Sequence, residues 1–376
     1  MNAAHLVAAR RTAVAPRRGA FNAVEAHDLA APVLRTCLSD AGIPPEAVGH
    51  VILGNALSGG GNVARLAALA AGIPARVPAL TMDTQCCSGL DAIALGARLV
   101  ASGAVEIVLA GGVESWSRAP LRARRPRSPE DAPAFYDRPA FSPFPDRDPD
   151  MLEAMAALAV ERGFTRAAQH NVAVDSHAKA RAARERMAAE IVPVAGLAHD
   201  AFTRDLTHRL AARAPLVAGE GACALDATTV AVEADAAACV LIVSGAVKER
   251  LGLPSCIVTA AASVGGEPER PYDALVPAVR AVLDQTGLAL DALAVIELME
   301  ASAPQLLENR RHLPLADDRL NRGGGALARG HPVGASGAIL GVRLFQELMD
   351  MSGGARGLAA IAAAGGLGSA LMLQRS

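Results

Sequence analysis

The chain has 376 residues, of which 52% are hydrophobic and only 3% aromatic, so its core must be built from alanine, valine, leucine and isoleucine. Its 36 basic and 38 acidic residues give a net charge of -2, which argues against a general role in binding nucleic acids or membrane surfaces. No basic and apolar leader opens the sequence, and no apolar run could span a bilayer, so we expect a cytoplasmic protein. The six cysteines show no metal-ligand spacing, and we expect reduced thiols and no metal site.

The N-terminal part of the chain alternates short apolar runs with helical patterns. The expected strands are residues 51–54, 77–82 and 107–110, the last closed by Gly111 and Gly112. The expected helices are residues 64–71, ended by Gly72-Ile73-Pro74, and residues 90–100. Because the strands are apolar throughout rather than at alternate positions, the sheet should be covered on both faces.

The middle of the chain breaks this pattern. Residues 117–150 are rich in arginine, proline and aspartate, which predicts a long excursion outside the core. The excursion contains a cluster of four arginines: Arg122, Arg124, Arg125 and Arg127. The cluster could meet a phosphate, although such runs are more often simply solvated. Two helical patterns follow, at residues 151–162 and 166–190, and the second leads into Ile191-Val192-Pro193-Val194.

The alternation resumes with an expected strand at residues 236–244, and the remainder repeats the first part in outline. Residues 296–299 correspond to the strand at 51–54, and Ser336-Gly337 corresponds to Ser88-Gly89. Residues 358–363 correspond to the strand at 107–110, and the Gly365-Gly366 pair after them corresponds to Gly111-Gly112. The spacings slip by a few residues, but the pattern favours a duplicated fold.

Cys86 stands directly before a turn of small residues and a run with the composition of a helix. The strand before it would deliver the thiol to the start of that helix, where unpaired N–H groups favour a thiolate. Cys86 is therefore a candidate nucleophile. The alternative is a buried structural thiol, since free cysteines are among the most buried residues.

His331 lies between Gly330 and Pro332 in a glycine-rich stretch. A single histidine is often just a surface-loop residue, but one flanked by residues that restrict the backbone is more often positioned for chemistry. A cysteine and a histidine together are the minimum for acyl transfer through a thioester.

Three motifs occur in the order found in one enzyme family: Cys86-Cys87-Ser88-Gly89-Leu90, the run from Ala110 to Ser115, and the run from Gly330 to Gly337. With them the chain resembles the thiolases, from about Arg11 to Leu373. The resemblance implies two similar βαβαβ halves in five α/β/α/β/α layers, with the site between them. It implies an N-terminal half made of residues 1–116 and 232–250, an inserted loop domain at 117–231, and a C-terminal half at 251–376. It also implies a homodimer or homotetramer.

By the same resemblance, Cys86 is the acylated nucleophile, and His331 activates it and helps to bind a thioester oxygen. Cys87 would not be acylated, because the turn that exposes Cys86 points the next side chain elsewhere. Two other parts of the family's machinery are altered. Met299 replaces the Asn of the Asn-Glu-Ala-Phe motif, and a thioether is a weak acceptor that cannot donate. Ala362 replaces the cysteine that takes a proton from the second acyl-CoA, and Ala364 replaces the first glycine after it.

The half of the site that would bind coenzyme A is also changed. The family's pantetheine-binding serine is not evident near Thr228-Thr229-Val230-Ala231. Further substrate contacts are implied for Arg204, Gly365 and Gly366. We expect no permanently bound cofactor, and an acyl donor that is either a coenzyme A thioester or a thioester on a carrier-bound pantetheine.

Three functions remain, in order of preference. The first is an acyltransferase that loads Cys86 and passes the acyl group to an acceptor other than through a standard Claisen condensation. The second is a conventional thiolase in which another group replaces the missing base. The third is a non-catalytic subunit of a larger acyltransferase assembly, against which the intact Cys86 and His331 motifs argue.

Overall fold

The computed structural model describes residues 3–58 and 60–376. Its N-terminal half is built on β1 (Ala4–Arg11), β3 (His50–Gly54), β4 (Ala79–Met82), β5 (Ile107–Ser115) and β10 (Ala234–Ser244). Their order across the sheet is β4-β3-β5-β10-β1. β3 runs parallel to β4 and β5, whereas β10 is antiparallel to β5 and β1. The short β2 (Ala15–Pro16) pairs with the start of β10.

The C-terminal half repeats this arrangement. Its strands are β11 (Cys256–Gly265), β12 (Val295–Leu298), β13 (Arg356–Ala363) and β14 (Leu367–Arg375), in the order β12-β13-β14-β11. Leu320 bridges Ile296 of β12 in the place that β4 holds beside β3. β1 and β11 pair with each other, so the two halves form one continuous sheet path. The duplicated fold predicted from the sequence is confirmed.

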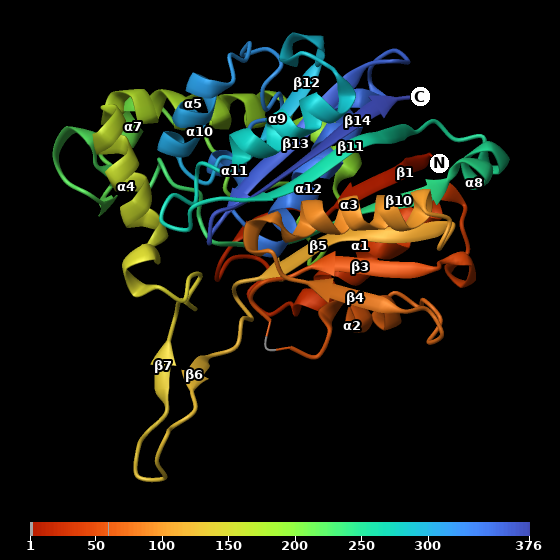
Figure 1. The fold of residues 1–376 in the computed structure, drawn as a ribbon, viewed down its shortest axis with the longest axis horizontal. Coiled ribbons are helices and arrows are strands. Elements are labelled where there is room, and N and C mark those ends of the chain that lie inside the picture. The colour runs from red at the N-terminus through yellow and green to blue at the C-terminus, as the bar shows by residue number, and fades with distance from the viewer. Residues whose placement is uncertain (1–2, 59) are drawn as a thin grey trace.

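Helices form three layers around these two halves (Figure 1). α1 (Ala26–Ala41) and α2 (Val63–Ala70) cover the outer face of the N-terminal half, and α9 (Leu275–Thr286) and α10 (Ala303–His312) lie on the opposite side. α3 (Ser88–Ala101) and α12 (Val333–Met349) lie between the two halves and pack against each other. α8 (Gly245–Leu251) packs on β1 and β10. Together the layers give the expected α/β/α/β/α order.

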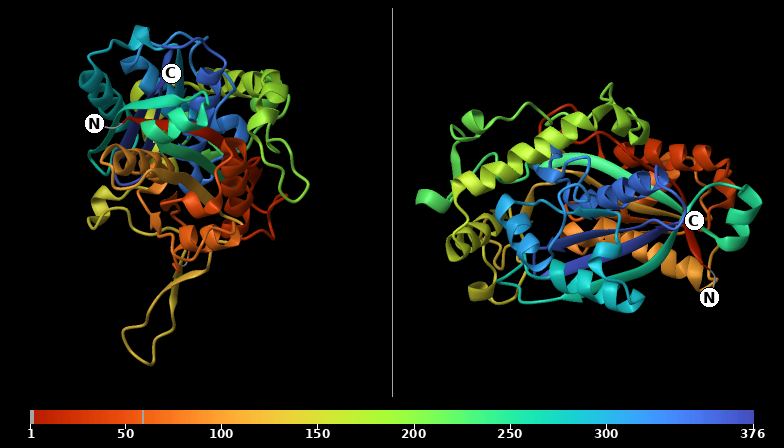
Figure 2. Two further views of the ribbon diagram at one scale, coloured as in Figure 1. Left: turned by 90° about the vertical axis from the view of Figure 1, so that its right-hand side faces the viewer. Right: turned by 90° about the horizontal axis from the view of Figure 1, so that it is seen from above.

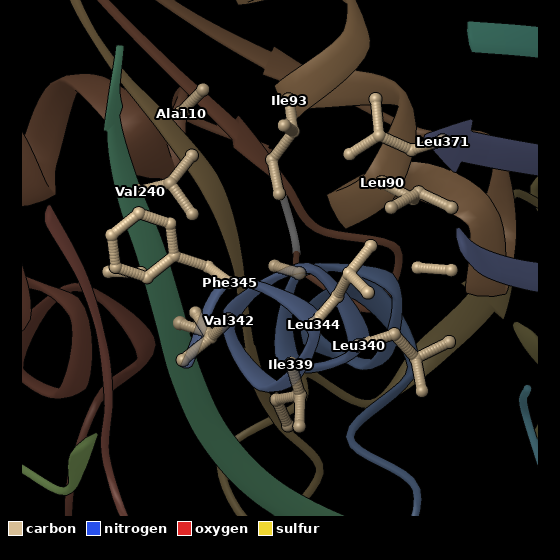
Figure 3. Close-up of a cluster of buried hydrophobic side chains, with 14 of the residues drawn as sticks. Leu90, Ile93, Ala110, Val240, Ile339, Leu340, Val342, Leu344, Phe345 and Leu371 are labelled. Carbon is tan, nitrogen blue, oxygen red and sulfur yellow. The ribbon is translucent and has the colours of Figure 1, made fainter. Parts of the chain in front are cut away.

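Three apolar clusters separate the layers. The central one surrounds α3 and α12 and includes Leu90, Ile93, Leu340 and Phe345 (Figure 3). The other two lie beneath α1 and α2 and beneath α9. Because α3 and α12 bury nearly their whole surface, they can carry few charged residues, and their sequences are correspondingly apolar.

The loop domain occupies the chain between β5 and β10. It contains β6 (Arg122–Arg124), β7 (Ala134–Tyr136), α4 (Met151–Arg162), α5 (Arg166–Ala182), α6 (Arg184–Met187), α7 (His208–Ala211), β8 (Leu216–Ala218) and β9 (Leu225–Asp226). The β6–β7 hairpin stands clear of the body in Figure 1 and in the left view of Figure 2. The predicted excursion outside the core is therefore confirmed. α11 (Ala326–Arg329) lies later in the chain and contacts α5.

Buried ion pairs fasten the loop domain to both halves. The guanidinium of Arg11 on β1, which is fully buried, donates to Glu190 and Asp200, with N–O distances of 2.7 Å each. Glu190 also accepts from Arg343 of α12. Removing one partner of such a buried set leaves an uncompensated charge, so each member is needed once the others are present.

Within the described residues, no helix is both long and apolar enough to cross a membrane.

Three details of the sequence prediction were wrong. β5 does not close at Gly111 and Gly112 but continues to Ser115. A methyl group at Gly111 would lie 2.0 Å from the carbonyl oxygen of Ala238, so this glycine permits close pairing with β10 rather than ending the strand. Gly365 and Gly366, predicted to echo this pair, instead form the turn between β13 and β14, with φ of 79° and 77°. The single helix predicted over residues 166–190 ends at Ala182, and a short helix and a 3₁₀ turn complete it.

Candidate active site

Cys86 lies in a sharp turn between β4 and α3. Gln85 before it has φ of 54°, a left-handed conformation that is unfavourable for a residue with a side chain. The carboxylate of Asp83 accepts from the backbone N–H of Gln85 at 2.8 Å, and the hydroxyl of Ser88 donates to the carbonyl of Gln85 at 2.6 Å. These hydrogen bonds stabilise the turn that places the thiol at the start of α3, as the sequence predicted.

His331 lies in the corresponding turn before α12. Gly330 has φ of 115°, and a methyl group there would lie 2.8 Å from the side chain of Ala234, so only glycine fits. The backbone N–H of His331 donates to the carbonyl of Val232 at 2.7 Å. The imidazole is thereby aimed from the C-terminal half toward the start of α3.

The two side chains meet across the halves, with 3.1 Å between Cys86 Sγ and His331 Nε2. The other ring nitrogen, Nδ1, lies 2.6 Å from Ser336 Oγ, which is 3.2 Å from the carbonyl oxygen of Pro332. A carbonyl can only accept, so we assign the Ser336 hydroxyl as donor to Pro332 and as acceptor from Nδ1–H. This tautomer leaves a lone pair on Nε2 facing the thiol.

Burial keeps both groups neutral. It raises the pKa of the Cys86 thiol to about 12, against the lowering effect of the backbone N–H groups of Ala364 and of Cys86 itself. It also lowers the pKa of His331 to about 4. A thiol therefore faces an imidazole at neutral pH, and a nucleophile forms only as the proton moves between them.

Two backbone N–H groups, those of Ala364 and of Cys86 itself, act on the Cys86 sulfur and lower the pKa of the thiol. The N–H of Ala364 comes from the turn after β13, and that of Cys86 from the 3₁₀ turn Gln85–Cys87, which leads into α3. A backbone N–H does not depend on the side chain, so the change from glycine to Ala364 leaves this donor in place. Donors of this kind stabilise the oxygen of a tetrahedral intermediate on Cys86.

The altered positions Ala362 and Met299 lie in two different apolar clusters. Ala362 forms the last but one pair of the β13–β14 ladder, opposite Gly368, and its methyl packs in the apolar cluster beneath α9. Met299 is buried in the central cluster, and with Ser336 and Gly330 it lines a cavity of about 10 Å³. Neither side chain can take a proton. Ser302, two residues after Glu300, accepts from the N–H of Gln305 and caps α10.

The structure does not bring all predicted residues together. The Arg204 guanidinium lies 4.2 Å over the ring of Phe202, and its backbone N–H donates to His177, so its contacts are with the loop domain rather than with Cys86 or His331. Gly365 lies under the carbonyl of Phe141, and a methyl group there would lie 3.1 Å from that oxygen. Cys87 is fully buried, with its sulfur 3.6 Å from the carbonyl oxygen of Ile361.

Sequence reasoning missed two residues that hold the site, Glu114 and Ser336. Glu114 follows the glycines of β5, and its buried carboxylate accepts from the N–H of Gly334 in the first turn of α12. Both residues lie inside motifs that the sequence analysis quoted. The signal available in the sequence for Glu114 was a carboxylate within an otherwise apolar strand, where burial is expected.

Comparisons with known proteins match nearly the whole chain to thiolases. The family pattern "Thiolase, N-terminal domain" matches residues 4–246, and "Thiolase, C-terminal domain" matches residues 253–375. A protein of Bacillus subtilis (strain 168), provisionally named acetyl-CoA C-acetyltransferase YhfS, is 36% identical over 380 residues, covering 100% of this chain and 99% of that protein. One of Staphylococcus aureus (strain MRSA252), provisionally named acetyl-CoA C-acetyltransferase VraB, is 32% identical over 387 residues, covering 100% of both.

Solved structures agree with this. The Bacillus anthracis acetyl-CoA acetyltransferase superposes with a TM-score of 0.91, and human mitochondrial 3-ketoacyl-CoA thiolase with 0.92. Each is 28% identical in sequence, and each comparison covers 100% of this chain and 99% of the other. Both halves of the chain, its fold and its relatives therefore give one answer: this protein is an acyltransferase that belongs to the thiolase family.

Proposed function

We propose that the protein forms an acyl thioester on Cys86 and transfers the acyl group to an acceptor other than by a standard Claisen condensation. In the first step the Cys86 proton moves to His331 Nε2 while the sulfur attacks the donor's thioester carbonyl. The N–H groups of Cys86 and Ala364 hold the resulting oxyanion. The donor's thiolate then leaves and takes the proton from His331.

The observation that carries this proposal is the 3.1 Å contact between Cys86 Sγ and His331 Nε2. The backbone N–H groups of Ala364 and Cys86, which lower the pKa of the thiol, support it. The lone pair that Ser336 leaves on Nε2 supports the same direction of proton transfer. The donor is a coenzyme A thioester or a carrier-bound pantetheine thioester, and the chemistry needs no permanently bound cofactor.

The second step is where this chain differs from a condensing enzyme. Taking a proton from an α-carbon needs a base near that carbon and an oxyanion site for the enolate. Ala362 supplies no base, and Met299 cannot donate a hydrogen bond. An oxygen, nitrogen or already stabilised carbon nucleophile needs neither, so we propose an acceptor of that class.

Thiolysis of acetoacetyl-CoA tests this proposal. The absorbance of acetoacetyl-CoA is followed with free coenzyme A, beside an authentic thiolase as control. We expect turnover at background level, because losing one oxyanion donor typically costs ~10²–10³ in rate and the missing base adds a comparable factor. Turnover within about tenfold of the control would overturn the proposal.

The names of the two bacterial relatives favour a second candidate, a conventional acetyl-CoA C-acetyltransferase. In that case another group would take the role of the missing base. The same assay separates the two functions, because the second candidate predicts rapid thiolysis.

We also propose a cytoplasmic homodimer or homotetramer, joined through the N-terminal half. β4 is an edge strand, and the exposed apolar side chains Leu66, Leu69 and Leu80 lie on α2 and β4. Unpaired strand edges with apolar neighbours are usually covered in soluble proteins. Light scattering that shows a stable monomer at micromolar concentration would contradict this assembly.

A further inference from the structure

Glu114 accepts hydrogen bonds from three backbone N–H groups and one side-chain amide near the active site. It lies on β5 and is 1% exposed. One carboxylate oxygen accepts from the backbone N–H groups of Ala56 and Gly334, at 3.0 Å each. The other accepts from the side-chain amide of Asn55 at 2.7 Å and from the N–H of Leu57 at 3.3 Å. All four neighbours donate, so the site requires an acceptor. Burial raises the pKa of Glu114 to about 7, against the lowering effect of the backbone N–H groups of Ala56, Gly334 and Leu57.

These four donors belong to different parts of the molecule. Asn55, Ala56 and Leu57 follow β3 in the N-terminal half, whereas Gly334 is the second residue of α12 in the C-terminal half. Gly334 is only three residues from His331. α12 has no side-chain cap of its own at Pro332, so Glu114 supplies the acceptor and the negative charge that a helix start favours.

The fit at this point is tight. A methyl group at Gly334 would lie 2.6 Å from the Cα of Asn55, and one at Gly112 would lie 2.0 Å from the carbonyl oxygen of Gly334. The start of α12 is thus in direct contact with the loop after β3 and with β5. The Glu114 carboxylate is the polar connection across that contact.

We propose that Glu114 is a positioning residue for the Cys86–His331 pair: it holds the first turn of α12, and with it His331, at the correct distance from the start of α3. The proposal rests on the proposed acylation of Cys86. Glu114 does not touch either reacting atom in this account. It acts through Gly334 and the backbone that leads to His331.

The charge of Glu114 has a second effect. Burial is the largest cause of the raised pKa of Cys86, and the N–H groups of Ala364 and Cys86 lower it, while the negative charges of Glu114 and Asp83 raise it further. A variant without the Glu114 charge should therefore release the Cys86 proton at lower pH. Replacing a residue with a purely structural role would not change the pH at which Cys86 loses its proton.

The test compares Glu114→Gln, Glu114→Ala and the control Val279→Ala. Val279 is fully buried in α9, in the cluster beneath that helix, so its truncation lowers stability without touching the site. Two quantities are measured on each folded protein. One is the single-turnover rate of acylation by acetyl-CoA with its half-saturating donor concentration, and the other is the pH profile of Cys86 alkylation by iodoacetamide.

We expect Glu114→Ala to lower the acylation rate by ~10², the cost of misplacing a reacting group by about 1 Å, with little change in half-saturation. Glu114→Gln keeps the shape of the side chain and one acceptor oxygen, so its acylation rate should fall by less than that of Glu114→Ala. Both variants should shift the alkylation profile to lower pH, whereas Val279→Ala should not.

An acylation rate for Glu114→Ala within about twofold of the unaltered protein, or an unshifted alkylation profile in both Glu114 variants, would overturn the proposal. Alkylation needs no acyl donor. If the unaltered protein is not acylated, the proposed function fails, but the alkylation profiles still decide the role of Glu114.

Discussion

Gly89 of α3 and Gly337 of α12 meet in a reciprocal contact at the centre of the molecule. A methyl group at Gly89 would lie 2.6 Å from the backbone nitrogen of Ala338, and one at Gly337 would lie 2.6 Å from that of Leu90. The repeated Ser-Gly pair therefore allows the two helices to touch backbone to backbone. Cys86 lies three residues before one glycine and His331 six residues before the other, so this contact fixes the spacing of the pair.

Replacing either glycine with alanine should push the two helices apart. We expect Gly89→Ala or Gly337→Ala to lower the free energy of unfolding by about 1–3 kcal/mol, the usual cost of overpacking, and to slow acylation of Cys86. Urea denaturation and a single-turnover assay measure the two effects. Gly265→Ala is the matched control, because no atom lies within 4 Å of the added methyl. Equal behaviour of all three variants would contradict the role of the contact.

His331→Ala should slow acylation of Cys86 by a factor of roughly 10²–10⁴, the usual worth of a positioned acid–base group. Ser336→Ala should have a smaller effect of about tenfold, because the imidazole remains but its tautomer is no longer fixed. Stopped-flow release of coenzyme A from acetyl-CoA measures both. A larger loss from Ser336→Ala than from His331→Ala would contradict the assigned roles.

Glu297 on β12 predicts a pH-dependent stability. It is fully buried, neither carboxylate oxygen has a hydrogen-bond partner, and burial raises its pKa to about 7. The folded state therefore holds the Glu297 proton more tightly than the unfolded chain does. Protonated Glu297 contributes to the free energy of unfolding at acid pH, and this contribution is lost as the pH rises toward 7. Glu297→Gln, which stays neutral, should therefore increase the free energy of unfolding at pH 8, by on the order of 2 kcal/mol, and change it little at pH 5.

Urea denaturation of both proteins at the two pH values checks this. The opposite pattern, with the variant weaker at pH 8, would show that ionised Glu297 stabilises the fold through its neighbours Arg343 and Arg329.

Installing a base should move the protein toward condensation chemistry. The double variant Ala362→Cys with Met299→Asn supplies both missing groups, and we expect it to raise acetoacetyl-CoA thiolysis at least about tenfold. It should also be less stable, because Met299 is 1% exposed in the central cluster and asparagine leaves polar groups there to be satisfied. If the double variant is inactive, Ala364→Gly is added. A folded triple variant with no gain would contradict the assignment of Ala362 to the missing base.

The repeat and the candidate residues Cys86 and His331 could be predicted from local patterns: apolar runs and small-residue turns. The five layers and the roles of the Cys86–His331 pair were implied by the resemblance of the motifs to those of the thiolases. Sequence reasoning misread Gly111 and Gly112 because a glycine that ends a strand and one that permits close pairing look alike without the partner strand. It missed Glu114 because its four donors come from two other segments of the chain. The donor at Ala364 was also hidden, since it belongs to the backbone and not to the side chain that differs.

Peptide mass mapping after incubation with short acyl-CoA or acyl-pantetheine donors tests the central claim most directly. The buried position of Cys87 and the contact between Cys86 and His331 predict one acyl group, on Cys86, that is absent from Cys86→Ala. An acyl group on Cys87, one that survives Cys86→Ala, or no acyl group with any donor would contradict the account.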